Sequence, residues 1–258
     1  MRRLRHLSGQ HRTASTNRLL GGLLAFNAGA INAGGFLLVA LYTSHMTGFV
    51  SMLADNLVLG NMALALGALG ALLAFTAGAA ATAMLVNWSR QNWLRSEVAL
   101  PLLIEAMLLL VFGLLGATFS RQTPFAVPLT VLMLAFIMGL QNALVSKVSA
   151  SQIRTTHMTG VITDIGIELG KMLYWNHSAR PPESRVRANR IKLRLYGTLL
   201  ACFVAGGLVG ALGFKYAGFV WVVPLAIVLF ALSLPPLWAD FLRVRRQRKT
   251  RLARQSHR

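Results

Sequence analysis

Six long apolar segments, separated by short polar stretches, constrain this chain more than any other feature. They cover residues 19–41, 62–87, 98–119, 125–146, 195–214 and 217–238. A helix of about 20 apolar residues crosses the hydrocarbon layer of a membrane, so each segment is long enough to be a transmembrane helix. Only 13% of the residues are charged, about half of the usual share in a soluble domain. We therefore predict an all-α, polytopic transmembrane helical bundle.

The basic residues gather at three places between these apolar segments. The net charge is +19, and 19 of the 26 lysines and arginines lie in residues 1–18, 174–194 and 241–258. Basic residues accumulate on the cytoplasmic side of membrane proteins, so we expect both termini and the 174–194 loop to be cytoplasmic. The basic tails are expected to contact anionic lipid headgroups. A nucleic-acid partner is not expected, because the charge flanks membrane spans.

An internal repeat divides the chain into two halves. Residues 25–33 read AFNAGAINA and residues 135–143 read AFIMGLQNA, while TSHMTG at 43–48 is matched by TTHMTG at 155–160. Two copies of His-Met-Thr-Gly at similar distances after an Asn-Ala pair are hard to obtain by chance, so we infer a duplication.

This duplication gives the predicted domain organisation. A basic tail at 1–18 precedes one membrane domain at 19–240, and a second basic tail follows at 241–258. Within the membrane domain, the repeats cover about 19–120 and 125–240.

Each motif opens a shorter apolar segment, at residues 46–60 and 157–173. If these short helices do not cross the membrane, each half has three crossings and the halves are inverted, as in many transporters. If they do cross, the chain has eight spans and the halves are parallel. The distribution of basic residues favours six long spans plus two short motif-bearing helices.

The paired motifs resemble those of the YoaK family, whose members are bacterial inner-membrane proteins built on a domain of unknown function. The resemblance covers roughly residues 19–240. In many relatives the second copy reads Thr-Tyr-Val-Thr-Gly, whereas this chain has His157 and Met158 within it. The resemblance implies a multi-pass protein of the bacterial inner membrane, and it implies no substrate.

The motif residues are candidates for a solute or ion path. A helix that begins at membrane depth presents free N–H groups and a partial positive charge, which suit an anion. Ser44 and Thr156, or Thr47 and Thr159, are predicted to cap these helices. The alternative is a capped helix start with a tight helix crossing and no ligand. The candidates from the motifs are His45, Thr47, Gly48, His157, Thr159 and Gly160.

Four of the seven acidic residues lie within apolar segments, where a charge is costly and points to function. These residues are Asp55, Glu105, Asp164 and Glu168. On the second short helix, Asp164 and Glu168 share a face with Lys171, so they either line a cavity or form ion pairs. Asn32, Gln141 and Asn142 lie inside long spans, where we expect hydrogen bonds between helices.

Together these features favour a small-solute secondary transporter or a channel-like permease over two alternatives. The first alternative is a non-transporting membrane scaffold or sensor, and the second is an intramembrane enzyme. The chain is expected not to be an enzyme, because no nucleophile stands out and nucleotide-binding motifs are absent. Neither a metal nor a cofactor is expected, the solute is unknown, and homo-oligomerisation is left open.

Overall fold

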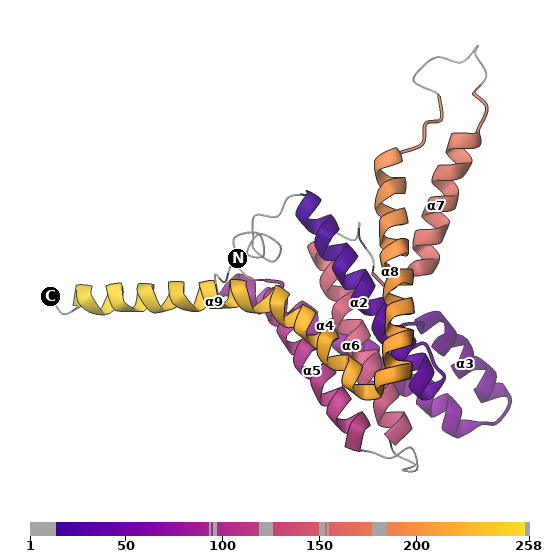
Figure 1. Cartoon of the computed structure of the whole chain (residues 1–258), viewed down its shortest axis with the longest axis horizontal. Coiled ribbons are helices and arrows are strands. Elements are labelled where there is room, and N and C mark those ends of the chain that lie inside the picture. The colour runs from indigo at the N-terminus through magenta and orange to yellow at the C-terminus, as the bar shows by residue number, and fades with distance from the viewer. Residues whose placement is uncertain are drawn as a thin grey trace.

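The computed structural model of the chain describes residues 14–92, 94, 97–118, 126–149, 153, 155–176 and 185–255. Across these residues the regular structure is helical throughout (Figure 1). The helices are α2 (Ala14–Val39), α3 (Met46–Val58), α4 (Met62–Gln91), α5 (Ala99–Thr118), α6 (Ala126–Val148), α7 (Met158–Leu173), α8 (Arg190–Ala217), the 3-10 helix η2 (Gly218–Trp221) and α9 (Val222–Gln255). The all-α prediction is therefore confirmed.

Five helical segments of the described chain are long and apolar enough to cross a membrane. They are Thr16–Leu37, Met62–Gln91, Ala99–Ala117, Leu129–Lys147 and Arg190–Arg243. The last segment contains α8, η2 and the first part of α9. Gly218 in η2 has a φ of 60°, a left-handed conformation that glycine adopts without steric cost. The chain changes direction at this turn, so α8 and α9 are separate arms of the bundle (Figure 1).

Helix α8 begins five residues before the apolar segment predicted at 195–214. The side chain of Asn189 explains this earlier start, because its oxygen accepts hydrogen bonds from the N–H groups of Ile191 (3.1 Å) and Lys192 (3.0 Å). Asparagine is among the best residues at this position, since it satisfies amide groups that the helix leaves unpaired. Helix α8 therefore carries a polar turn ahead of its apolar part.

Helices α2 and α8 cross at very close range, and glycine makes this approach feasible. Gly29 of α2 faces the main-chain carbonyl of Phe203, and Gly206 of α8 faces the carbonyl of Phe26. A Cβ atom at either glycine would collide with that backbone oxygen. Small residues allow such backbone contact between helices in membranes.

The crossing of α4 with α6 has the same arrangement. Gly78 faces the main-chain carbonyl of Phe136, and Gly139 faces the carbonyl of Phe75. Gly139 and Phe136 lie 110 positions after Gly29 and Phe26, the separation of the first repeated motif. Each half of the chain thus supplies one helix to each crossing.

The core and the outer surface are both apolar. Buried side chains of α2, α5, α6, α8 and α9 form one core, which contains Leu24, Leu102, Leu134, Leu199 and Leu229. Large apolar side chains also cover the outside: on α4 alone, Leu64, Leu66, Leu73 and Met84 are more than half exposed. An apolar exterior of this extent is the surface that contacts lipid.

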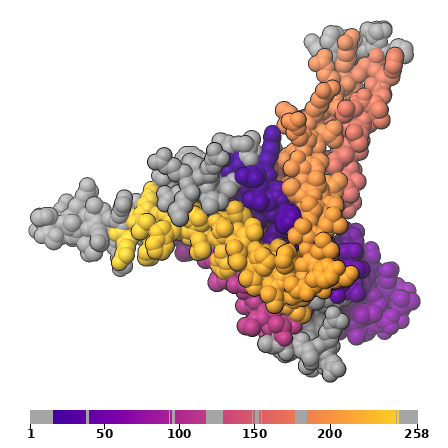
Figure 2. Space-filling view, in the orientation of Figure 1, coloured from indigo at the N-terminus to yellow at the C-terminus, as the bar shows by residue number. Residues whose placement is uncertain are grey.

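Two helical hairpins project from the bundle. Helix α3 packs against α4 and helix α7 packs against α8, and Figure 1 shows the two hairpins pointing away from each other. The hairpin of α7 and α8 stands clear of the rest of the molecule in Figure 2. Helix α9 leaves the bundle on another side and bends near Pro235 and Pro236, which cannot donate main-chain hydrogen bonds.

Candidate functional site

The segment after α2 folds back into the bundle before α3 begins. The N–H and hydroxyl groups of Ser44 donate to Oδ1 of Asn32, at 3.3 and 3.0 Å. Asn32 lies about two helical turns before the end of α2, so α3 starts beside the interior of α2. The observed partner of Asn32 is therefore a loop residue, and the expected hydrogen bond to another long helix stays a prediction.

The predicted helix caps are wrong in both motifs. His45 and His157 occupy the N-cap positions of α3 and α7, and neither makes a side-chain cap hydrogen bond. The sequence suggests that Gly48 allows two helices to cross closely, but the structure gives this glycine a different role. A Cβ atom at Gly48 would collide with the imidazole ring of His45, so this glycine leaves space for that ring.

Most polar residues of the motif helices face outward. His45, Thr47 and Asp55 are exposed on α3, as are His157 and Thr159 on α7, while Gly160 is partly exposed. Because α3 packs on α4 and α7 packs on α8, the structure places these residues on two separate hairpins.

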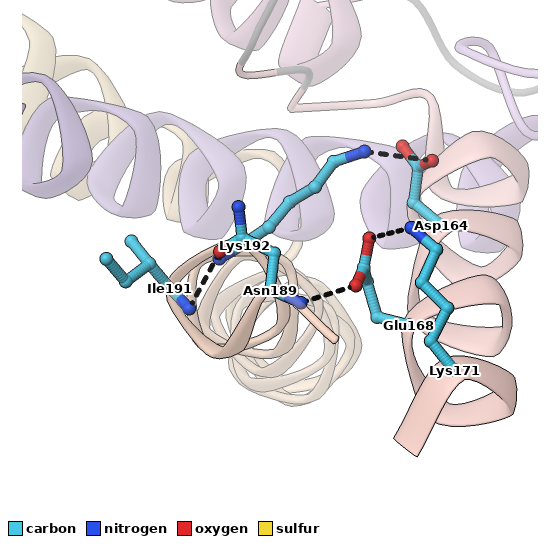
Figure 3. Close-up of polar contacts among 6 residues, drawn as sticks. All are labelled: Asp164, Glu168, Lys171, Asn189, Ile191 and Lys192. Carbon is cyan, nitrogen blue, oxygen red and sulfur yellow. Dashed lines mark hydrogen bonds and ion pairs between the residues drawn. The ribbon is translucent and has the colours of Figure 1, made fainter. Parts of the chain in front are cut away.

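The acidic residues of α7 bind it to the start of α8 (Figure 3). Glu168 is 2% exposed, and its carboxylate accepts from the N–H of Asn189 at 2.7 Å and from Lys171 at 2.9 Å. Asp164 lies 3.5 Å from Nζ of Lys192. Two hydrogen bonds lower the pKa of the Glu168 carboxyl below its usual range. The larger effect comes from the N–H of Asn189 and the next from Lys171. The ion-pair alternative for Glu168 and Lys171 is thus present in the structure.

A second set of polar side chains lies inside the bundle. Glu105 of α5 is fully buried, and neither of its carboxylate oxygens has a hydrogen-bond partner among the described residues. Nε2 of Gln141 donates to the carbonyl of Leu24 at 3.4 Å, which links α6 to α2 as predicted. Within the same part of the chain, Oε1 of Gln141 and Oδ1 of Asn142 have no partner. Unpaired buried polar atoms are unusual and indicate a functional role or a bound group.

Asn27 belongs to this set and was missed by the sequence analysis. It is 1% exposed, and neither atom of its amide group has a partner among the described residues. The internal repeat does not mark Asn27, because its counterpart in the second half is Ile137. The one feature of the sequence that could have identified Asn27 is its amide side chain within an apolar span.

A cavity of about 400 Å³, which we call the vestibule, opens between the start of α2, the segment after α6 and the start of α8. Its polar walls come from Asn17, Arg18, Ser149, Asn189, Lys192 and Tyr196. Its apolar walls come from Ile153, Ile191 and Leu195. The vestibule therefore lies between the two halves, at the end of the bundle that carries the predicted cytoplasmic charge.

A narrow void of about 10 Å³ adjoins the vestibule and shares Asn17, Ser149 and Ile153 with it. This volume is close to that needed for one water molecule. Its remaining walls are apolar and come from Leu20, Gly21, Leu24, Leu144 and Val145. The void therefore extends the vestibule into the contact between α2 and α6, the two helices that the hydrogen bond from Gln141 to the carbonyl of Leu24 joins. In the described part of the chain, no three His, Cys, Asp or Glu side chains come together as a metal site would require.

These features define a multi-pass α-helical membrane protein with a cavity between two packed halves. The chain belongs to the family described as "Protein of unknown function (DUF1275)", which matches residues 20–234. It is similar to the UPF0700 transmembrane protein YoaK of Bacillus subtilis (strain 168), with 25% identity over 190 residues that cover 72% of this chain and 83% of that protein. No solved structure was found to match the chain.

Proposed function

We propose that this protein is a small-solute secondary transporter or channel-like permease of the bacterial inner membrane. The vestibule carries this proposal, because it is a cavity with polar walls between the two halves, and a narrow void extends it along the contact of α2 with α6. Transporters bind their solutes at such interfaces between halves. No catalytic chemistry is assigned to the chain.

The proposed architecture is an inverted repeat with six spans. The matching glycine contacts at the two crossings support a duplication, and η2 divides the longest apolar segment into two spans. Helices α3 and α7 have 13 and 16 residues, so they measure about 20 and 24 Å and are shorter than the hydrocarbon layer. Three crossings per half place the second half in the opposite orientation.

The proposed orientation has both termini in the cytoplasm. Arginines precede or open α2, basic residues open α8, and others follow the bend in α9. With six spans, only Arg121 and Lys215 fall on the outer side, which agrees with the positive-inside rule. The vestibule then opens toward the cytoplasm.

Within this architecture, the solute path runs from the vestibule to the buried groups around the α2–α6 contact. Asn27, Gln141 and Asn142 on these two helices, and Glu105 on α5, are among the buried groups that have unpaired polar atoms in the described part of the chain. The acids of α7 act indirectly, because they hold α7 against the α8 turn that forms one wall of the vestibule.

Swelling of proteoliposomes tests the permease proposal without knowledge of the solute. Vesicles containing the full chain are mixed with iso-osmotic glycerol, urea, acetate, lactate or glycerol 3-phosphate, and light scattering reports swelling when the solute enters. Asn17→Phe, which places a ring where vestibule and void meet, should abolish the swelling seen with wild type. Leu19→Phe is the matched control, because Leu19 is 54% exposed on the outer side of α2. Equal swelling of both variants, or none above protein-free vesicles for any solute, would contradict the proposal.

The scaffold alternative has one supporting observation. Helix α9 continues to Gln255 beyond the bundle, and its end carries many basic residues that a partner could recognise. If the protein acts as a scaffold, deletion of residues 244–258 abolishes its cellular phenotype while Asn17→Phe leaves the phenotype unchanged. The permease proposal predicts the reverse.

A further inference from the structure

We propose that the vestibule binds a small organic oxyanion, that is, a carboxylate or a phosphate ester with a short apolar part. This inference names the ligand class of the proposed permease site. It rests on the proposed function only in taking the bound anion to be the transported solute.

The vestibule carries positive charge. Arg18 and Lys192 line it, and no aspartate or glutamate belongs to its described lining. The side chain of Lys192 is 41% exposed and its only acidic neighbour in the described ion pairs, Asp164, lies at the long distance of 3.5 Å. Arg18 forms no ion pair with any described residue. Two cations at the rim of a cavity attract an oxyanion and can bind it through charge-assisted hydrogen bonds.

The buried acid Glu168 interacts electrostatically with Lys192 and offsets part of its charge, but it makes no ion pair with Lys192 or Arg18. Glu168 directs its two oxygens to the N–H of Asn189 and to Lys171 (Figure 3). Two N–H groups in the first turn of α8 already have an acceptor, because the side chain of Asn189 accepts from Ile191 and Lys192. The anion is therefore held by side chains of the vestibule, and the end of α8 serves only to place Lys192.

Asn17 provides an independent sign that a polar ligand belongs here. Its Oδ1 atom is buried and has no partner among the described residues, although the residue lines both the vestibule and the void. A buried amide is normally satisfied by protein, water or ligand. The unpaired oxygen can accept from a hydroxyl of the ligand, and the NH2 of the same amide can donate to an oxyanion.

The volume and the remaining walls indicate an organic anion and not an inorganic ion alone. The cavity of about 400 Å³ lies within the range of sites for small organic molecules. Ile153, Ile191 and Leu195 supply an apolar surface opposite the charged groups, which suits a ligand with a hydrocarbon part. Two sources share this chemistry, namely a soluble metabolite and the headgroup region of an anionic phospholipid.

Binding measurements on the full chain test this inference. The protein is purified in dodecyl maltoside and placed in nanodiscs of phosphatidylcholine only. Affinity is measured by isothermal titration calorimetry for glycerol 3-phosphate, for lactate and for dihexanoylphosphatidylglycerol, with glycerol as the uncharged comparison. We expect saturable binding of at least one anion and none of glycerol. Arg18→Gln and Lys192→Gln should each weaken binding by about tenfold or more, because each removes a charged hydrogen-bond donor.

Matched variants separate the site from general surface charge. Arg190→Gln removes an equal charge from the same end of α8, but Arg190 does not line the vestibule, so its affinity should stay at the wild-type value. Asn17→Leu keeps the size and charge of the cavity and should also weaken binding. Thermal unfolding of each variant without ligand reports whether the fold is intact.

The outcomes separate this inference from the permease proposal. Binding of glycerol 3-phosphate or lactate assigns a soluble ligand, and binding of the short-chain phospholipid alone assigns a lipid headgroup; either keeps the anion site. Affinity that is unchanged in Arg18→Gln and Asn17→Leu, or equal for glycerol, overturns it. Anion binding without flux in the swelling assay would contradict only the permease proposal. Flux of uncharged solutes without anion binding would contradict only the proposed anion site.

Discussion

At the scale of single residues, two buried glutamates differ in whether their carboxyl groups have hydrogen-bond partners. Glu168 is 2% exposed and is satisfied by a backbone N–H and a lysine. Glu105 is fully buried, and its carboxylate has no described partner. A carboxyl group without a partner in an apolar interior is costly, so stability does not account for an acid at this position. The interior path proposed above gives Glu105 a role.

The same substitution should therefore have opposite effects at these two positions. Glu105→Gln keeps the shape of the side chain and replaces an acid that lacks a partner by a neutral amide, so its midpoint of thermal unfolding should be equal to or higher than that of wild type. Glu168→Gln removes the charge that Lys171 and Asn189 stabilise, so its midpoint should be lower. Tryptophan fluorescence during heating in detergent measures both midpoints. A lower midpoint for Glu105→Gln would mean that Glu105 has a stabilising partner in the folded protein.

The stabilisation from Glu168 should depend on pH in a defined direction. Its pKa is lowered in the folded protein from an ordinary value of 4.5, so its contribution is present above that value and is lost as the pH falls through the lower folded pKa. Lys171, Lys192 and Asp164 are the charged groups near it on α7 and α8. The difference in unfolding midpoint between wild type and Glu168→Gln should be present at pH 6 and should shrink as the pH falls below 4.5. A difference that grows as the pH falls would contradict this direction.

At the scale of elements, the bundle depends on two crossings in which glycine touches backbone. Gly29 and Gly206 serve the α2–α8 crossing, and Gly78 and Gly139 serve the α4–α6 crossing. A backbone carbonyl cannot move aside as a flexible side chain can, so the whole helix would have to shift to admit even a methyl group.

Alanine substitutions test this dependence with an internal control. Gly29→Ala should lower the free energy of unfolding by about 1–3 kcal/mol, the usual effect of overpacking. Gly67→Ala lies in α4 with open space around it, so it should raise the free energy of unfolding by about 0.5–1 kcal/mol, because alanine favours helix more than glycine does. Unfolding by sodium dodecyl sulfate in mixed micelles provides both values. If Gly29→Ala is neutral, the crossing is looser than the structure indicates.

The elements were predictable from sequence to a much greater extent than the site. Ala99–Thr118 agrees with the predicted 98–119 within a residue, whereas α8 begins five residues before the predicted 195, and α9 begins five residues after the predicted 217 and continues to Gln255. Apolar length places the membrane-embedded part of a helix, but polar residues such as Asn189 determine where the helix begins. The caps of α3 and α7 were predicted wrongly, because propensity favours Ser or Thr at this position, whereas His45 and His157 occupy it. The vestibule was not predicted, because its walls come from residues as distant in sequence as Asn17, Ser149 and Lys192, none of which belongs to a repeated motif.

At the scale of the whole molecule, the number of crossings determines how the halves are oriented. With six crossings, the turn after α4 and the segment after α6 both lie in the cytoplasm, and the turn between α5 and α6 lies outside. Eight crossings reverse all three positions. The span count is therefore a measurable property of the intact protein.

Cysteine labelling distinguishes the two topologies. Asn92→Cys, Gln122→Cys and Ala150→Cys are introduced one at a time into a Cys202→Ser background, and a membrane-impermeant maleimide is applied to intact spheroplasts or to inside-out vesicles. We expect positions 92 and 150 to react only in inside-out vesicles and position 122 only in spheroplasts. The opposite pattern at all three positions would establish eight crossings.

The reciprocal crossings have a consequence for how the protein is made. Helix α2 finds its glycine-matched partner only in α8, and α4 finds its own only in α6. When the ribosome has synthesised only the first half of the chain, α2 and α4 lie in the bilayer without the helices that they contact in the folded protein. Both crossings can form only after the second half has entered the membrane.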